Sequence, residues 1–290
     1  MNSGEGNGPI IMSGRKLADE MQARLAKETA EMRRHGITPG LATILVGDDG
    51  PSATYISMKH RACEEIGIRS IHTHLPASTS QGELLQTIGR MNEDPEVDAI
   101  LVQIPLPDGL DEDEALLSVA PDKDADGLNP INLGRLVIGK PGPLPCTPNG
   151  ILALLVHYGV PIEGKNVAIV GRGLTIGRPL ALLLSLKRPH CNAAVTVLHS
   201  AVPDMAAHLR DADIIIAAAG SPGLITKDMV KPGAAVVAAG ITRKGKKLLS
   251  DVDEDVAEVA GWITPRIGGV GPMTVAMLME NTVTAARRRV

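Results

Sequence analysis

Apolar residues recur along the chain in two alternating patterns, one with helical spacing and one in short unbroken runs. The segment 13–35 places Leu17, Met21 and Leu25 on one helix face and ends at Gly36, so it predicts a helix. An apolar run that is bounded by turn residues predicts a buried strand. By these criteria we predict further helices over 52–66 and 80–92, and strands over 41–46, 68–75 and 99–104.

A segment rich in proline and glycine, GKPGPLPCTPNG at 139–150, interrupts this alternation. Such a sequence is not expected to form regular structure, and it is the best candidate for a domain boundary. A second glycine-rich break covers 268–272 and precedes an apolar helix predicted over 273–289. Between the two breaks the pattern predicts strands over 166–170, 194–198, 213–218 and 234–239, and a helix over 178–186.

The alternation of strands and helices predicts an α/β protein with two domains, each built on a parallel sheet. We assign residues 1–148 to the first domain, with 1–9 as a disordered leader, and residues 149–272 to a Rossmann-like second domain. The hydrophobic pattern alone does not say where the last helix packs.

Charge and composition narrow the functional classes. The net charge is −4, and aromatic residues make up only 1% of the chain. Nucleic-acid binding usually needs a basic surface and aromatic side chains for the bases, so we exclude a nucleic-acid partner. The one basic run, Arg287 to Arg289, is interpreted as solvating a helix end, where positive charge is favourable.

The chain lacks signals for secretion or membrane insertion. Its apolar runs are far shorter than the roughly 20 residues of a membrane-spanning helix. The start, MNSGEGNGPI, has neither the basic nor the apolar region of a signal peptide. The three cysteines are far apart and form no C-x-x-C pair, which favours a reducing compartment. We therefore predict a soluble cytoplasmic protein without a membrane partner.

A glycine-rich loop follows the predicted strand 166–170 and leads into a helix. Backbone N–H groups and the helix dipole at such a turn attract a pyrophosphate. The spacing G-x-G-x-x-x-G is one residue longer than the common dinucleotide motif, so a βα turn without a ligand is the alternative. Residues of this loop that we predict to bind a cofactor are Gly171, Arg172, Gly173, Thr175, Ile176 and Gly177.

The residues after this loop favour NADP over NAD. An NAD site usually has an Asp or Glu after the second strand to bind the ribose hydroxyls. No carboxylate occurs from residue 171 to 203, whereas Arg172 and Arg178 are present and His199 and Ser200 end the second strand. These groups would accommodate a 2′-phosphate.

Three residues of the first domain are candidates for catalysis. Tyr55 and Lys59 are four residues apart and share a helix face. Gln103 is a polar residue at the carboxyl end of an apolar strand, where open α/β sheets bind ligands. A surface lysine beside a half-buried tyrosine is the simpler alternative. The Tyr-x-x-x-Lys pair of short-chain dehydrogenases does not apply, because it follows the glycine loop instead of preceding it.

The acidic segment DKDADG at 122–127 resembles the beginning of a calcium-binding loop. Such a loop requires a bidentate Glu at its twelfth position, and Leu133 occupies that position. We therefore exclude calcium and predict no metal site. The remaining alternatives are a functional Asp126 and a simple acidic turn.

Six motifs occur in the order found in one enzyme family. They are Tyr55-x-x-x-Lys59, VQIPLP (102–107), KDADG (123–127), PCTPNG (145–150), GRGLTIGRP (171–179) and GGVGPMTVAMLMENT (268–282). In these motifs the chain resembles the bifunctional methylenetetrahydrofolate dehydrogenase/cyclohydrolase family, over nearly its whole length after the first residues.

The resemblance implies a two-domain α/β homodimer that binds folate and NADP in the cleft between its domains, with 273–290 returning to the first domain. It implies NADP-dependent oxidation of methylenetetrahydrofolate and hydrolysis of the methenyl product to formyltetrahydrofolate, in one-carbon metabolism. By resemblance, Lys59 is the catalytic lysine, Gln103 its partner, Tyr55 the ring that stacks on the aminobenzoate, and Asp126 the acid that binds the pterin. Further residues implied are Gly268, Gly269 and Pro272 for the substrate and Ile241 for the cofactor.

Some positions depart from the usual family pattern. Gly173 replaces a common serine, Arg266-Ile267 replaces Val-Pro, and AAGIT at 238–242 replaces Asp-Val-Gly-Ile-Asn. These departures concern the cofactor side and the loop before the double glycine. The alternatives left open are a dehydrogenase with a weak or lost hydrolase step, a variant that prefers NAD, and a non-catalytic folate- or nucleotide-binding regulator.

Overall fold

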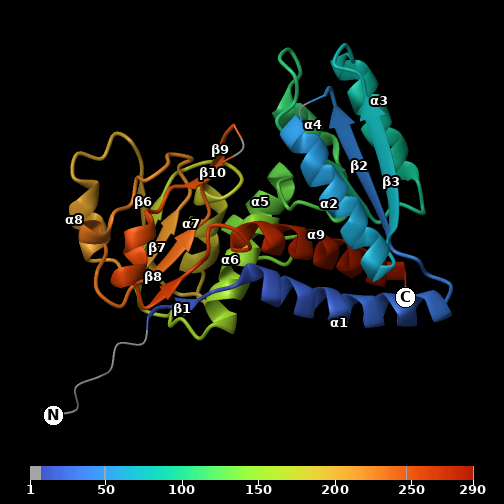
Figure 1. The fold of residues 1–290 in the computed structure, drawn as a ribbon. Helices are drawn as coiled ribbons and strands as arrows, with labels where there is room; N and C mark the ends of the chain where they lie inside the picture. Colours follow the sequence, from blue (N-terminus) through green and yellow to red (C-terminus); the bar gives the residue numbers. More distant parts are fainter. Residues whose placement is uncertain (1–7, 49, 246, 290) are drawn as a thin grey trace. The chain divides into compact units, whose positions relative to one another are not determined.

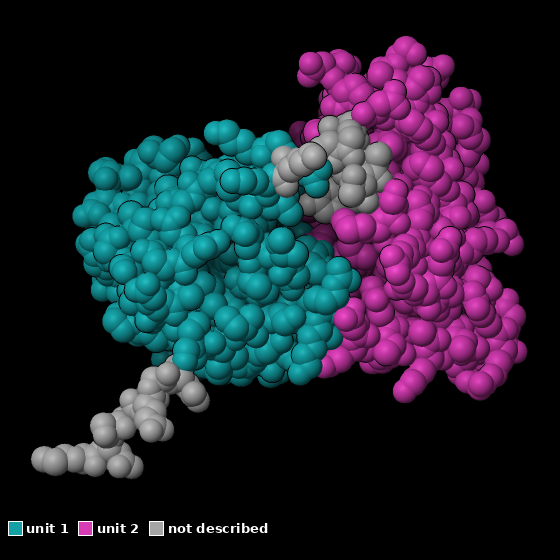
Figure 2. Space-filling view, viewed as in Figure 1, with its two compact units in different colours: residues 1–17, 147–273 teal, residues 18–146, 274–290 magenta. Residues whose placement is uncertain are grey.

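The computed structural model describes residues 8–48, 50–245 and 247–289, and in the helix that begins at Gly50 it describes side chains from Ile56 onward. The chain forms two compact units (Figure 2). Unit 1 comprises residues 1–17 and 147–273, and unit 2 comprises residues 18–146 and 274–290. Among the described residues, no helix has the length and apolar character needed to cross a bilayer.

Unit 2 is built on a three-stranded parallel sheet in the order β3-β2-β4; Figure 1 shows β2 and β3 side by side. Its strands are β2 (Gly40–Val46), β3 (Arg69–Leu75) and β4 (Ala99–Val102). The central strand β2 is buried at every position, as expected for a strand covered on both faces. The helices of this unit are α2 (Gly50–Ile66), α3 (Gln81–Glu93), α4 (Glu112–Ser118) and α5 (Pro130–Val137).

Side-chain caps set the starts of three of these helices. Ser80 and Glu83 form a reciprocal capping box at α3, and the Asp111 carboxylate accepts the Glu114 N–H at α4. Asn129 caps α5, and Pro130 occupies its first turn, where its missing N–H costs nothing.

Unit 1 contains a six-stranded parallel sheet in the order β1-β11-β8-β7-β5-β6. The strand β5 lies between β6 and β7, so the strand order reverses beside it, and ligands bind at such a point in open α/β sheets. A separate hairpin pairs β9 with β10. The strands are β1 (Ile10–Ile11), β5 (Asn166–Val170), β6 (Ala194–Leu198), β7 (Ile214–Ala217), β8 (Ala235–Ala238), β9 (Ile241–Lys244), β10 (Lys247–Ser250) and β11 (Trp262–Ile263). The helices are α6 (Cys146–His157), α7 (Gly177–Ser185) and α8 (Met205–Arg210), and α6 starts one residue before the unit does.

The first and last long helices, α1 (Gly14–Arg34) and α9 (Val270–Ala286), each contribute to both units. From Thr274 onward the last helix belongs to unit 2, where the Cys63 thiol lies 3.6 Å from the Met279 sulfur. The prediction that the C-terminal helix returns to the first domain is therefore confirmed, as is the two-domain α/β class.

Two expectations about the chain's organisation differ from the structure. The segment 139–150 is not irregular throughout, because α6 begins at Cys146; Pro148 lies in its first turn, which tolerates proline. Residues 10–17 belong to unit 1 and not to the first domain, because Ile10 and Ile11 pair with Trp262 and Ile263. Of the proposed leader 1–9, residues 1–7 lie outside the described residues.

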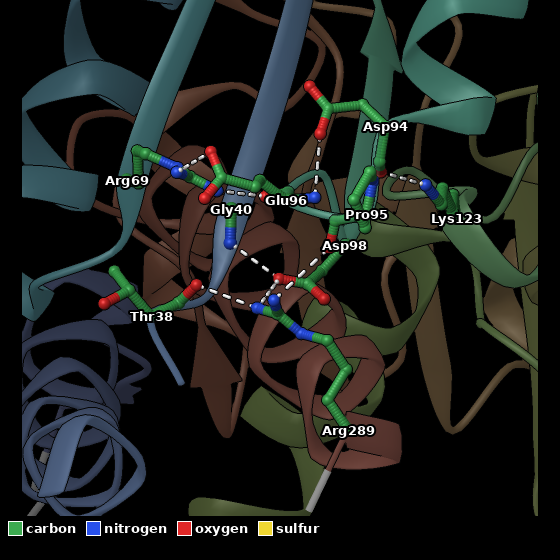
Figure 3. A network of polar contacts seen from close by, with 9 residues as sticks. All are labelled: Thr38, Gly40, Arg69, Asp94, Pro95, Glu96, Asp98, Lys123 and Arg289. Atoms are coloured by element: carbon green, nitrogen blue, oxygen red, sulfur yellow. Dashed lines mark hydrogen bonds and ion pairs between the residues drawn. The ribbon is translucent and has the colours of Figure 1, made fainter. Parts of the chain in front are cut away.

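The basic run at the C-terminus does not simply solvate a helix end. Arg287 pairs with Glu28, and Arg288 donates to the Asp122 carbonyl oxygen at 2.8 Å. Arg289 lies at the centre of a polar network (Figure 3), in which it donates to Asp98 at 2.7 Å. Its guanidinium also donates to the carbonyl oxygens of Thr38 at 2.8 Å and Pro95 at 3.3 Å. These contacts fasten the end of the chain to the amino ends of β2 and β4.

Candidate active site

A buried lysine and a glutamine form the centre of the candidate site in unit 2. Lys59 is 8% exposed on α2, and its Nζ donates to Gln103 Oε1 at 2.9 Å. Gln103 follows β4 at its carboxyl end, and its Nε2 donates to the Ile104 carbonyl oxygen at 2.7 Å. That second bond sets the orientation of the amide, so the oxygen of Gln103 faces the amine.

The surroundings of Lys59 disfavour its charged form. Burial lowers the pKa of Lys59, and the negative charge of Asp126 opposes this shift. An amine with a lowered pKa is neutral more often near physiological pH. A neutral amine that donates one hydrogen to Gln103 retains a lone pair that can accept a proton.

The loop that carries Asp126 is held by a neighbouring acid. The Asp124 side chain is buried, and its carboxylate accepts the N–H groups of Gly127 and Asn129, each at 2.9 Å. The Leu128 N–H at 3.3 Å and Asn132 Nδ2 at 2.8 Å also donate to it. The carboxylate that resembled a calcium ligand is therefore used to shape its own loop. Among the described residues, no group of three or more His, Cys, Asp or Glu is placed to hold a metal ion.

Two residues of this site were missed by the sequence analysis. Cys146 is buried; burial and then the charge of Asp126 raise its pKa well above the ordinary value, so it is a neutral thiol. Asn281, on α9, donates to the carbonyl oxygens of Ala125 at 3.0 Å and Leu144 at 3.1 Å. A single amide in a largely apolar helix was the available signal for Asn281, because buried amides need partners.

Tyr55 lies in the first half of α2, a helix that was predicted over 52–66 and that begins two residues earlier in the structure. Its side chain is outside the described part of the chain. Its stacking role therefore stays a prediction.

The glycine loop of unit 1 joins β5 to α7 at the point where the strand order reverses. Among the described residues, no side chain caps α7; the Arg178 N–H donates to the Gly173 carbonyl oxygen at 3.2 Å, and Pro179 has no N–H, so Gly177 carries the remaining N–H of the first three residues. Gly171 has φ +120, and a Cβ there would lie 2.1 Å from the Ala218 carbonyl oxygen. A Cβ on Gly177 would lie 2.2 Å from the Gly171 carbonyl oxygen, whereas Gly173 is exposed with open space around it. The loop thus needs two of its glycines for folding, and its third glycine, Gly173, leaves open space beside the start of α7.

The other predicted cofactor residues lie at the same carboxyl edge of the unit 1 sheet. Arg172 and Thr175 are exposed in the loop, and Ile176 precedes α7. His199 and Ser200 follow β6, and the His199 ring accepts the Ala201 N–H at 3.3 Å. Ile241 begins β9 and is 37% exposed.

Comparisons with known proteins place the chain in a family. The model of the "Tetrahydrofolate dehydrogenase/cyclohydrolase, catalytic domain" matches residues 12–126, and that of the "Tetrahydrofolate dehydrogenase/cyclohydrolase, NAD(P)-binding domain" matches residues 145–290. The chain belongs to this family. A bifunctional protein FolD from Syntrophotalea carbinolica is 56% identical over 279 residues, which cover 96% of each chain.

Solved structures of the family have the same fold. The FolD methylenetetrahydrofolate dehydrogenase/cyclohydrolase of Campylobacter jejuni gives a TM-score of 0.93 at 43% identity and covers 97% of this chain and 99% of its own. The Trypanosoma brucei enzyme, solved with NADP cofactor and an inhibitor, gives 0.92 at 40% identity and covers 98% of this chain and 99% of its own.

The family's glycine pair has a packing role in unit 1. Arg15 N donates to the Gly268 carbonyl oxygen at 2.9 Å, and a Cβ on Gly14 would lie 1.8 Å from the Gly269 carbonyl oxygen. The start of α1 therefore packs directly on this backbone. Pro272 lies in the first turn of α9. Gly268, Gly269 and Pro272 are in unit 1, whereas Lys59, Gln103 and Asp126 are in unit 2.

Two departures from the family pattern have visible surroundings. Arg266 donates to Glu254 at 3.0 Å, while Ile267 is 70% exposed. The segment 238–242 lacks the aspartate that is common in the family. A buried aspartate from another part of the chain, Asp251, lies at the same edge of the sheet. Asp251 accepts the N–H groups of Ala219 at 2.7 Å and Gly220 at 2.9 Å, in the loop after β7. A carboxylate is thus present at this edge, although it comes from a different part of the chain.

Proposed function

We propose that the protein oxidises 5,10-methylenetetrahydrofolate with NADP and then hydrolyses the methenyl product to 10-formyltetrahydrofolate. The observation that carries the proposal is the buried, Gln103-bound amine of Lys59, with Asp126 close enough to influence its pKa. Membership of the family supports both activities, and the FolD relatives are named bifunctional.

In the oxidation, the protein's task is to hold the reacting carbons together. NADP, when bound, supplies the hydride acceptor. Holding the hydride-donating and hydride-accepting carbons about 3–3.5 Å apart can remove much of the barrier, and no protein acid is required. In this proposal Asp126 holds the pterin by hydrogen bonding, Tyr55 stacks on the aminobenzoate, and the uncapped start of α7 receives the phosphates.

The hydrolysis needs proton transfer, and Lys59 can provide it. The neutral amine takes a proton from the water that attacks the methenyl carbon, and it returns this proton to the ring nitrogen when the carbon–nitrogen bond breaks. The hydroxyl left on the carbon loses its own proton to solvent as the formyl C=O forms, which accounts for the one proton that the reaction releases. Gln103 orients the amine without adding a charge that would raise its pKa. Burial of Cys146 as a neutral thiol likewise avoids a second negative charge beside the lysine.

A direct assay tests the two activities separately. Purified protein is given methylenetetrahydrofolate with NADP or with NAD, and dinucleotide reduction and methenyl hydrolysis are followed by absorbance. We expect both reactions, and a kcat/KM for NADP at least about tenfold higher than for NAD, since one charged hydrogen bond to the 2′-phosphate contributes this much. Reduction without hydrolysis would leave a dehydrogenase only, and no reduction of either dinucleotide would refute the proposal.

The preference for NADP should depend on the loop arginine. Arg172→Gln is expected to reduce the NADP over NAD preference about tenfold with little change for NAD. Arg210→Gln is the matched control, because Arg210 ends α8 just before β7 begins, at the opposite end of the sheet.

We also propose a homodimer that forms through β3. This strand pairs with β2 on one side, and among the described residues no strand pairs with its other side. An unpaired edge of seven residues can pair with a second copy of itself.

The three cysteines are buried free thiols, which supports the proposed cytoplasmic location.

Sedimentation velocity tests the dimer. Wild-type protein is expected at twice the protomer mass, and His74→Lys is expected to weaken the dimer at least about tenfold, because lysine on an edge strand opposes pairing. His35→Lys is the control, since His35 is exposed just after α1 and far in sequence from β3. A monomer in the wild type, or an unchanged dimer in His74→Lys, would argue against pairing through β3.

A further inference from the structure

A cleft in unit 2 lies at the opposite end of β4 from Gln103. It has a volume of about 510 Å³, within the range of small-molecule sites, and Ala99 at the start of β4 lines it. Its apolar walls include Pro141, Pro143 and Ala285. The mechanism proposed above does not use this cleft.

Two arginines of the cleft share a single carboxylate oxygen. Arg135 NH1 lies 3.5 Å and Arg288 NH1 lies 3.6 Å from Asp122 Oδ1. Because both nitrogens are close to the same atom, one oxyanion can contact both guanidinium groups at once. The Asp122 side chain is 67% exposed, so it can move aside at little cost.

Most donors of these two arginines are available to a ligand. A guanidinium carries five N–H donors. Arg135 NH1 donates to Asn132 at 2.9 Å and Arg288 NH1 donates to the Asp122 carbonyl oxygen at 2.8 Å. Within the described parts of the chain, the other nitrogens of both groups have no hydrogen-bonded acceptor.

The remaining charges do not cancel this positive potential. Lys123 also lines the cleft, with its amine held by the carbonyl oxygens of residues 91 and 94. Asp124 is buried, and its two oxygens are occupied by the N–H groups of its own loop and by Asn132. Of the acids that line the cleft in the described part of the chain, Asp122 is the one that faces solvent.

We propose that this cleft binds a small organic oxyanion, whose phosphate or carboxylate bridges Arg135 and Arg288 and whose apolar part lies on Pro141 and Pro143. Paired guanidinium groups recognise both kinds of oxyanion through bidentate hydrogen bonds. The occupant also contacts Asn281, the asparagine that holds the Ala125 carbonyl oxygen beside Asp126.

Titration of nucleotide-free full-length protein with phenyl phosphate, benzoate and inorganic phosphate tests the proposal, with binding measured by calorimetry and by ligand-detected NMR. We expect saturable binding of phenyl phosphate or benzoate with Kd at or below about 1 mM. Arg135→Gln and Arg288→Gln should each weaken it at least about tenfold. Tighter binding of phenyl phosphate would identify a phosphate as the group that the cleft recognises, and tighter binding of benzoate would identify a carboxylate.

Three further variants keep the outcome interpretable. Thr284→Trp fills the cleft from an exposed position and should block binding with both arginines intact. Arg34→Gln removes an arginine that is 74% exposed elsewhere in unit 2 and should change nothing. Arg172→Gln should leave the signal intact, which excludes binding at the glycine loop. Absence of saturable binding, or equal Kd values in Arg135→Gln, Arg288→Gln and wild type, would overturn the proposal.

Discussion

Replacing Lys59 by methionine is expected to lower the rate of methenyltetrahydrofolate hydrolysis by about 100-fold or more, the usual contribution of a positioned acid–base group. Hydride transfer should be affected much less, within about tenfold, because it depends on positioning and needs no protein acid. The measurement is the rate of each step with purified variant and saturating NADP.

The pH profile separates a chemical role of Lys59 from a structural one. Hydrolysis in the wild type requires the neutral amine of Lys59. Its rate should therefore increase as pH rises through the pKa of Lys59, which burial has lowered. In the Lys59→Met variant, the hydrolysis rate should no longer show this dependence on pH. Lys27→Met is the matched control, because Lys27 is exposed on α1.

The stability of the Lys59 variant provides a second check. The pKa of Lys59 is lower in the folded than in the unfolded chain, so the unfolded chain binds more protons; the resulting cost in folding free energy sets in as pH falls below the unfolded-chain pKa and is complete below the lowered one. Methionine removes that cost, and the Tm should not fall. Hydrolysis retained at the wild-type rate would refute the role of Lys59; lost hydrolysis with a strongly reduced Tm would indicate misfolding instead.

Replacing Arg289 by alanine is expected to lower the free energy of unfolding by about 3 kcal/mol, the low end for breaking a buried ion pair. The Asp98 side chain is 5% exposed, and in the variant it keeps the Gly40 N–H at 2.8 Å but loses its cation. Arg289 also joins the chain end to the carbonyl oxygens of Thr38 and Pro95 (Figure 3). Urea denaturation followed by circular dichroism measures the change.

Two further variants test the cause of this loss. Arg34→Ala removes an exposed ion pair and should cost no more than about 0.5 kcal/mol. The double variant Asp98→Asn with Arg289→Ala should recover part of the stability, because the buried charge is gone while an oxygen remains for Gly40.

The pH dependence of the Arg289 variant has a definite sign. Burial raises the pKa of Asp98, and the Gly40 N–H and the charge of Arg289 oppose the shift, so removing Arg289 raises the pKa further. A folded-state pKa above the unfolded value means that stability increases as pH falls through it. The deficit of Arg289→Ala should therefore shrink in acid. A deficit that is unchanged or larger in acid would contradict a buried Asp98 charge as its cause.

Elements with strong local signals could be predicted from the sequence. The strands β5 and β6 have the predicted bounds, and α3 is shifted by one residue at each end. Short elements were missed for identifiable reasons. The helices α4 and α8 have only seven and six residues, too few to establish a hydrophobic period. The strands β1 and β11 have two residues each and exist only through their pairing.

The candidate site was predictable in its parts and not in its assembly. Lys59 and Gln103 were indicated by helix spacing and by a polar residue at a strand end. Cys146 and Asn281 had no comparable signal in the chain, since a cysteine in a proline-rich segment and an amide in an apolar helix each have many structural explanations. Their importance comes from contacts with residues 125 and 144.

The sequence by itself determined the α/β alternation, the glycine loop at the end of β5 and the family to which the chain belongs, because these depend on local periodicity and on motifs in order. Only the tertiary structure decided that Lys59 is buried against Gln103 near Asp126, and that Arg289 is bound to Asp98 instead of solvating a helix end. The physical reason is that burial and charge pairing depend on residues far apart in the chain. A residue's own neighbours in sequence do not set the dielectric environment that shifts its pKa or the partner that stabilises its charge.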